Sequence, residues 1–179
     1  MIKDFSGDYA FLSNFYPSPF YSEGILYPTV EHYFQAMKTL RLGWRKQIAE
    51  ACSPGVAKQM GRRVPLRSDW EDIKTSVMEE GLRLKFSNPK LREKLLSTGN
   101  ESLVEGNTWH DNCWGDCNCK TCRRVVGENR LGILLMSLRE EYSHNKYGKR
   151  AEIGVLDDYG RIPRELIKNA LNNLKCIEE

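Results

Sequence analysis

Three side chains able to donate, accept or transfer protons recur at helical spacing early in the chain: Glu31, Gln35 and Lys38. On a helix of about 3.6 residues per turn they fall on one side and form a polar stripe. A carboxylate and an amine on one stripe can carry out acid–base or nucleophilic chemistry on a ligand lying along the helix. The alternative interpretation is the solvated face of an amphipathic helix, and spacing alone leaves both open.

A second group of chemically versatile side chains occupies residues 105–116, which show no core periodicity. Two indoles, three carboxylates, two amides and a histidine lie within these twelve residues. Such loops suit a ligand with a flat base and hydroxyl groups, because rings stack on it and amides orient it. The candidates are Asn107, Trp109, Asp111 and Trp114. A structural loop anchored by its tryptophans and by Asx turns is the alternative.

Six cysteines are present, and four of them lie close together. Cys117, Cys119 and Cys122 are candidate zinc ligands, and His110 could substitute for one of the four clustered thiols. Structural zinc sites usually use two cysteine pairs separated by a longer spacer, so four thiols within ten residues are awkward for one tetrahedral ion. Free thiols in a reducing cytosol remain the alternative.

Composition limits the class of protein. The chain has 179 residues and a formal net charge of +3, which permits an anionic ligand but does not indicate a nucleic-acid binder. The N-terminus has no apolar signal region, and no stretch approaches the roughly 18 apolar residues of a membrane span. We therefore expect a cytoplasmic protein without a membrane partner.

The elements that must position these residues are mostly helical, which predicts an α+β fold with a small β element in a single domain over residues 1–146. Residues 147–179 are expected to form a C-terminal extension with one helix. Three kinds of signal indicate these elements: residues that cap the start of a helix, apolar residues at helical spacing, and turn residues. They predict a hairpin at Glu23-Gly24, a helix from Val30 to about Arg41, helices opening at Ser53-Pro54, Ser68–Glu71 and Asn88-Pro89, a short strand at Leu103–Glu105, and a helix over Leu131–Tyr142.

Several of these segments together resemble the NADAR family, the YbiA-like group, in the same order from about Phe5 to Tyr142. The motifs that carry the resemblance are Leu12-Ser13-Asn14-Phe15, Thr29–Lys38, Met60-Gly61-Arg62, Arg67–Glu71, Val77-Met78, Lys85-Phe86, Leu103–Glu105, Asp111, Trp114–Asp116 and Gly127–Met136. The cysteine segment Cys117–Cys122 and residues 147–179 depart from the usual family pattern.

The resemblance implies an α+β fold of YbiA-like type and N-glycosidase activity. Family substrates fall into two classes: ADP-ribosylated guanine in nucleotides or nucleic acid, and early riboflavin-pathway intermediates that lose ribose 5-phosphate. The family's functional positions correspond here to Glu31, Lys38, Trp70 and Asp111. Expected neighbours in the pocket are Asn14, Phe15, Arg62 and Trp109.

A mechanism follows from these assignments as a hypothesis. Lys38 attacks the anomeric carbon, Glu31 serves as acid and base, and Asp111 holds hydroxyls or shares proton transfer. Trp70 or Trp109 stacks on the substrate. The reaction requires no cofactor, although a structural zinc is an option. The alternatives are the riboflavin-intermediate glycosidase, a non-catalytic ADP-ribose-binding module, and a zinc-containing nucleic-acid module. The oligomeric state is left open.

Overall fold

A computed structural model describes residues 1–145 of the chain. The predicted extension over residues 147–179, with its helix, lies outside the described residues. Contacts divide the described chain into two compact units, residues 14–85 and residues 1–13 with 86–145. Both are mainly helical and each contains a two-stranded sheet. The α+β fold class is confirmed.

Residues 14–85 begin with the predicted hairpin. Strands β1 (Phe20–Ser22) and β2 (Ile25–Tyr27) pair antiparallel. Glu23 and Gly24 in the turn have φ of 49° and 73°, the left-handed conformation that tight hairpin turns require. The helices that follow are α1 (Val30–Ala36), α2 (Leu42–Ala49), α3 (Pro54–Gly61) and α4 (Trp70–Phe86).

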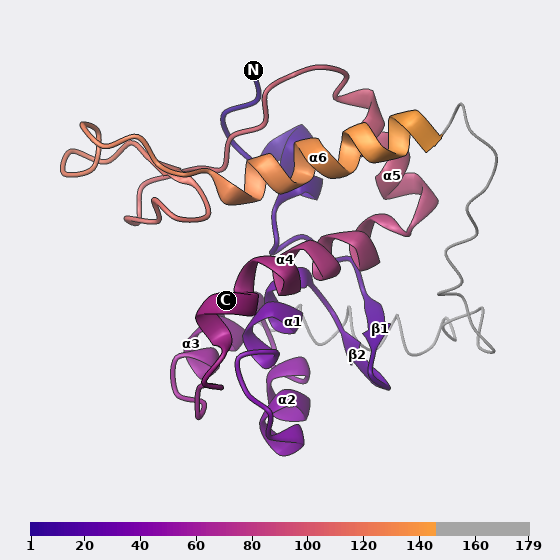
Figure 1. Ribbon diagram of the computed structural model, residues 1–179, viewed down its shortest axis with the longest axis vertical. Coiled ribbons are helices and arrows are strands. Elements are labelled where there is room, and N and C mark those ends of the chain that lie inside the picture. Colours follow the sequence, from indigo (N-terminus) through magenta and orange to yellow (C-terminus); the bar gives the residue numbers. More distant parts are fainter. Residues whose placement is uncertain (146–179) are drawn as a thin grey trace. The chain divides into compact units, whose positions relative to one another are not determined.

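Helix α1 lies at the centre of this unit. It packs against α2, α3 and β2, and Figure 1 shows these elements gathered around it. All seven of its residues are buried. Tyr33 fixes α1 on the hairpin through edge-on contacts with Tyr27 at 5.3 Å and Phe20 at 5.7 Å between ring centroids. Polar side chains on α1 are therefore inside the protein.

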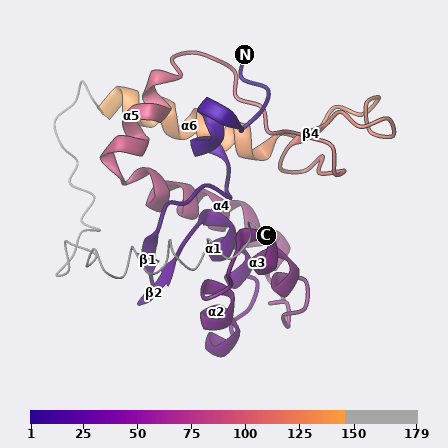
Figure 2. The ribbon, with the colours of Figure 1, turned by 180° about the vertical axis from the view of Figure 1, so that it is seen from behind.

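The other unit contains a 3-10 helix, η1 (Gly7–Leu12), with α5 (Pro89–Ser97) and α6 (Arg130–Asn145). Helix α5 packs against α6 and η1. The strands β3 (Gly106–Asn107) and β4 (Asp116–Cys117) pair in parallel. Around β4 the chain forms a long loop beyond the start of α6 (Figure 2). Regular structure is thus sparse where the chemically rich residues 105–122 lie.

Helix starts agree with the sequence signals. Thr29, Ser53 and Asn88 each accept a backbone N–H at the start of a helix, as N-cap residues do. Three predictions differ from the structure. The first helix ends at Ala36, α2 was not predicted, and the segment around Leu103 forms a single bridge to Ile2 in place of a strand. Within residues 1–145, no helix combines the length and the apolar character needed to cross a bilayer.

Candidate functional site

Glu31 and Gln35 form a buried polar pair on α1. Their exposed fractions are 6% and 3%, which excludes the solvated-face interpretation for both. Nε2 of Gln35 donates a hydrogen bond to Oε1 of Glu31 at 2.8 Å. The backbone N–H of Glu31 is bonded to the carbonyl of Asn14 at 3.0 Å. Burying a carboxylate costs folding free energy unless hydrogen-bond donors contact it. The hydrogen bond from Gln35 therefore helps to stabilise Glu31 in its buried position.

Lys38 lies in the turn after α1 and not on the helix, which corrects the prediction of a helix to about Arg41. Its backbone N–H reaches the carbonyl of Gln35 at 3.4 Å, the tightened bonding of a helix end. The Lys38 Nζ lies 5.8 Å from the Phe34 ring centroid and 5.9 Å from that of Trp70. Those two rings meet edge to face at 5.0 Å. The turn therefore places the amine against two aromatic rings.

Burial lowers the pKa of Lys38 below its ordinary value of 10.5. Glu31 and Glu71 raise that pKa, whereas the positive charges of Lys58 and Arg62 lower it further. An amine with a lowered pKa is neutral in a larger fraction of molecules near neutral pH, and the neutral form is the nucleophile. Lys38 thus has the electrostatic environment expected of a nucleophilic lysine.

The side-chain amides of Asn14 and Gln35 are buried, and the oxygen of each, Oδ1 of Asn14 and Oε1 of Gln35, accepts no hydrogen bond from the described residues. The Nδ2 of Asn14 is directed instead to the Met78 sulfur at 3.3 Å, a weak acceptor. A buried oxygen without a donor costs stability. The hydroxyl groups of a sugar could supply the missing donors.

The remaining predicted residues of this unit are near its surface. Phe15 is 43% exposed, and the Lys58 Nζ lies 6.0 Å from its ring centroid. Arg62 directly follows α3 and is exposed. Trp70, in contrast, is buried at 5% exposure. Residues 14–85 therefore bring together Glu31 and Gln35 with Lys38 and its aromatic neighbours, bordered by positive charge.

Sequence reasoning missed Lys58 and Glu71 as charges that act on Lys38. Lys58 belongs to α3, and its effect on Lys38 depends on how α3 packs against α1. Glu71 was noted as part of a capping signal and of the family motif Arg67–Glu71, but not as a charge near Lys38. No local motif reveals the effect of either residue on Lys38, because that effect comes from tertiary packing.

Asp111 lies in the other unit and organises its own loop. Its Oδ1 accepts the backbone N–H groups of Cys113 at 3.1 Å and Trp114 at 2.8 Å. Asn107, which is 4% exposed, donates from Nδ2 to the Asp111 carbonyl at 2.7 Å. Its Oδ1 accepts the N–H groups of Trp109 and Asp111. The Asx turns of the structural alternative are present, so substrate contacts by Asp111 and Asn107 stay predictions.

The two indoles of this loop differ in exposure. Trp109 is 59% exposed and borders a hollow of about 260 Å³ together with Asn107. Trp114 is half-buried, and its carbonyl accepts the N–H of Leu131 at the start of α6. An exposed indole beside a hollow suits stacking on a flat base, whereas Trp114 ties the loop to a helix.

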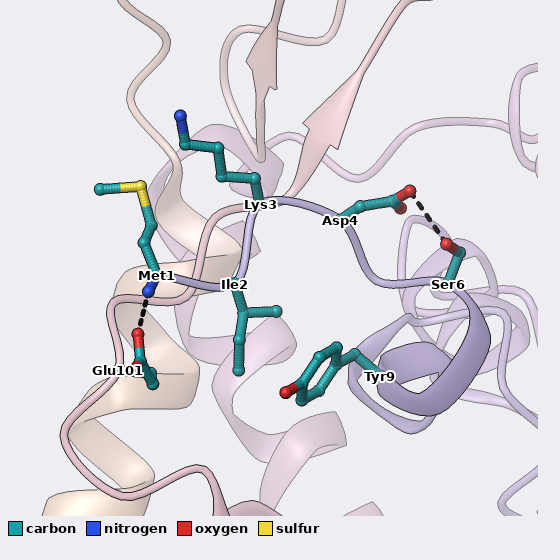
Figure 3. A pocket seen from close by; sticks show the side chains of 7 residues that line it. All are labelled: Met1, Ile2, Lys3, Asp4, Ser6, Tyr9 and Glu101. Carbon is teal, nitrogen blue, oxygen red and sulfur yellow. Dashed lines mark hydrogen bonds and ion pairs between the residues drawn. The ribbon is translucent and has the colours of Figure 1, made fainter.

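A larger hollow of about 400 Å³ contains none of the predicted site residues. Figure 3 shows it lined by the side chains of the N-terminal segment and Glu101. The Met1 ammonium pairs with Glu101 there, and Ser6 Oγ donates to Asp4 Oδ2 at 2.9 Å. These charged and polar groups are paired with one another at the surface. We therefore assign the hollow no catalytic role.

The predicted zinc ligands Cys117, Cys119 and Cys122 do come together, and His110 joins them. The four ligand atoms all lie within 4.8 Å of one another. Cys113 is not part of this group. The residues can therefore hold a metal ion, with the histidine in the fourth position.

The chain is similar to known proteins over most of its described length. Residues 3–143 match the NADAR domain. The N-glycosidase YbiA of Shigella flexneri is 46% identical over 144 residues, 79% of this chain and 86% of that protein. A riboflavin biosynthesis protein of Vibrio vulnificus is 35% identical over 75% of this chain but only 36% of that protein. The NMR structure of Escherichia coli YbiA matches with a TM-score of 0.69 at 39% identity, covering 86% of this chain and 93% of that chain.

Proposed function

This chain belongs to the NADAR family and is an enzyme that acts on N-glycosyl bonds, and we propose that it removes ADP-ribose from ADP-ribosylated guanine in nucleotides or nucleic acid. The observation that carries the proposal is Lys38, an amine whose pKa is lowered and which lies against the Phe34 and Trp70 rings. The positive charges of Lys58 and Arg62 suit the diphosphate of ADP-ribose.

In the proposed reaction the neutral Nζ of Lys38 attacks the anomeric carbon of the ribose. The new C–N bond forms as the glycosidic bond breaks, and the bonding electrons leave with the guanine, which takes up a proton. The sugar ring opens to a Schiff base on Lys38. Water then adds to the imine, returns the amine and releases ADP-ribose as the aldehyde, which closes to its ring form.

Glu31 is the proposed proton carrier of both steps. It gives a proton to the departing base and later takes one from the attacking water. As that proton leaves, the negative charge that develops on Glu31 stabilises the oxocarbenium character at the anomeric carbon. The hydrogen bond from Gln35 holds the carboxylate in one orientation. Trp70 keeps its predicted role in stacking on the substrate, and the roles predicted for Trp109 and Asp111 stay predictions.

The test is borohydride trapping of the purified chain with ADP-ribosylated guanine nucleotide, read by intact mass and peptide mapping. The expected result is a reduced ADP-ribosyl adduct on Lys38, absent from Lys38→Ala. Lys94→Ala is the matched control, since the Lys94 Nζ also lies 5.5 Å from a ring, that of Phe11. Release of guanine without an adduct would exclude the covalent step and leave a mechanism based on carboxylates.

A second candidate substrate class is the riboflavin intermediates that lose ribose 5-phosphate. The similarity to the Vibrio vulnificus riboflavin biosynthesis protein favours it. An adduct of ribose 5-phosphate on Lys38, with no turnover of the guanine substrate, would select this class. Binding of ADP-ribose without turnover of either substrate would indicate a non-catalytic module.

A further inference from the structure

Four soft ligand atoms converge in the loop between β3 and α6. The Nδ1 of His110 lies 3.2 Å from the Cys122 sulfur and 3.3 Å from the Cys119 sulfur. The Cys117 sulfur belongs to the same group, and its side chain is buried. We refer to these four residues as the His110–cysteine cluster. It uses none of the residues to which the glycosidase reaction assigns a role.

We propose that the His110–cysteine cluster binds one Zn²⁺ ion through three thiolates and the imidazole. Around a tetrahedral zinc with Zn–S near 2.3 Å and Zn–N near 2.0 Å, ligand atoms lie roughly 3.5–3.8 Å apart. The atoms of the cluster, all within 4.8 Å of one another, need only small movements to reach that arrangement. Three cysteines with one histidine form a ligand set that structural zinc uses.

One backbone hydrogen bond in the cluster supports a metal site. The backbone N–H of Cys122 donates to the Cys119 sulfur at 3.3 Å. A backbone donor stabilises negative charge on a sulfur, as outer-shell partners do at metal sites.

Other chemistry fits the geometry less well. An iron–sulfur cluster distributes its cysteine sulfurs over several irons, whereas these four atoms converge on one point. A disulfide would use two of the sulfurs and leave the imidazole without a function. With four protein ligands the zinc would have no open position, so its role is structural.

The consequence concerns the segment 106–129, where strands β3 and β4 have two residues each. A segment with so little regular structure gains stability when a metal crosslinks it. It contains Trp109 and Asp111, so the ion would limit the movement of both. Zinc binding would therefore stabilise the loop that carries two predicted substrate-binding residues.

The first test measures zinc by mass spectrometry in the untagged, full-length protein purified under reducing conditions. One Zn²⁺ ion per chain is expected. His110→Ala and Cys119→Ser should bind zinc more weakly by at least the roughly 10–100-fold known for loss of an outer-shell partner. Cys113→Ser is the matched control and should keep the metal. Absence of zinc with full thiol reactivity, or its loss only from Cys113→Ser, would overturn the proposal.

A second test needs no variant and has no dependence on activity. Lys120, Arg123 and Arg124 are exposed trypsin sites inside the segment. After zinc is removed with a chelator, cleavage at these sites should become faster, while cleavage at the exposed Arg63 should not change. Equal cleavage with and without chelator would show that no metal holds the segment.

Discussion

The side chain of Gln35 occupies the space that a Cβ on Gly61 would need. Helix α3 can approach α1 this closely only because residue 61 has no side chain. The same Gln35 donates to Glu31 at 2.8 Å. Gly61 therefore acts on the buried carboxylate through Gln35, and a helix-to-helix contact positions a group proposed to transfer protons.

Gly61→Ala is expected to displace Gln35 and to lower both stability and activity. Overpacking a close contact costs about 1–3 kcal/mol in the free energy of unfolding. Gly55→Ala is the matched control in the same helix, because its Cβ would meet only Ser53 Oγ at 3.8 Å. Gly61→Ala should show a lower free energy of unfolding in denaturant and a lower turnover rate than Gly55→Ala. A Gly61→Ala protein as stable and active as Gly55→Ala would contradict this account.

Gln35→Ala removes the donor to Glu31 without crowding Gly61. Losing a hydrogen bond to a charged group costs about 1.5–3 kcal/mol, so the free energy of unfolding should fall by about that amount. Turnover should also fall, since the carboxylate loses its fixed orientation. Gln59→Ala serves as the control, because Gln59 is an exposed amide on α3. Unchanged turnover in Gln35→Ala would show that this hydrogen bond is only structural.

Asp111→Asn separates a catalytic from a structural role of Asp111. The amide oxygen of asparagine can still accept the N–H groups of Cys113 and Trp114, so the melting temperature should stay near that of the wild type. Loss of the charge should reduce turnover if Asp111 holds hydroxyls or shares proton transfer. Asp111→Ala should reduce both quantities. Full turnover in Asp111→Asn would leave only the loop-forming role.

Local signals in the sequence predicted most of the helix starts. Thr29, Ser53 and Asn88 cap helices as expected because capping depends on residues within one turn. The hairpin at Glu23-Gly24 was equally local. Helix α2 begins after Arg41, which makes no side-chain capping hydrogen bond, so no local start signal marked it.

The sequence was sufficient to select the candidate site residues, but not to predict their burial or their contacts. A helical wheel places Glu31 and Gln35 on one stripe, yet a stripe looks the same whether it faces water or a packed helix. Gln35 is packed against α3 through the close contact at Gly61. The choice of His110 over Cys113 in the cysteine cluster likewise depends on loop folding, which spacing does not determine.

Lys58→Ala should shift the pH dependence of the reaction. The positive charge of Lys58 lowers the pKa of Lys38, so its removal should raise that pKa. Because the neutral amine is the proposed nucleophile, the rate rises with pH through the pKa of Lys38. The acid limb of the profile should therefore move to higher pH in Lys58→Ala and stay in place in Lys58→Arg, which keeps the charge. If the acid limb of the pH–rate profile stays in place in Lys58→Ala, the ionisation that controls the rate is not that of Lys38.

Lys38 should also make stability depend on pH. Its pKa is lower in the folded protein than the ordinary 10.5, so between these two values the unfolded chain binds more protons than the folded one. The free energy of unfolding then rises with pH across that window. Lys38→Met removes the titrating group and should flatten this rise in denaturant unfolding measured at several pH values. An equal slope in wild type and Lys38→Met would mean that the Lys38 pKa is not lowered by folding.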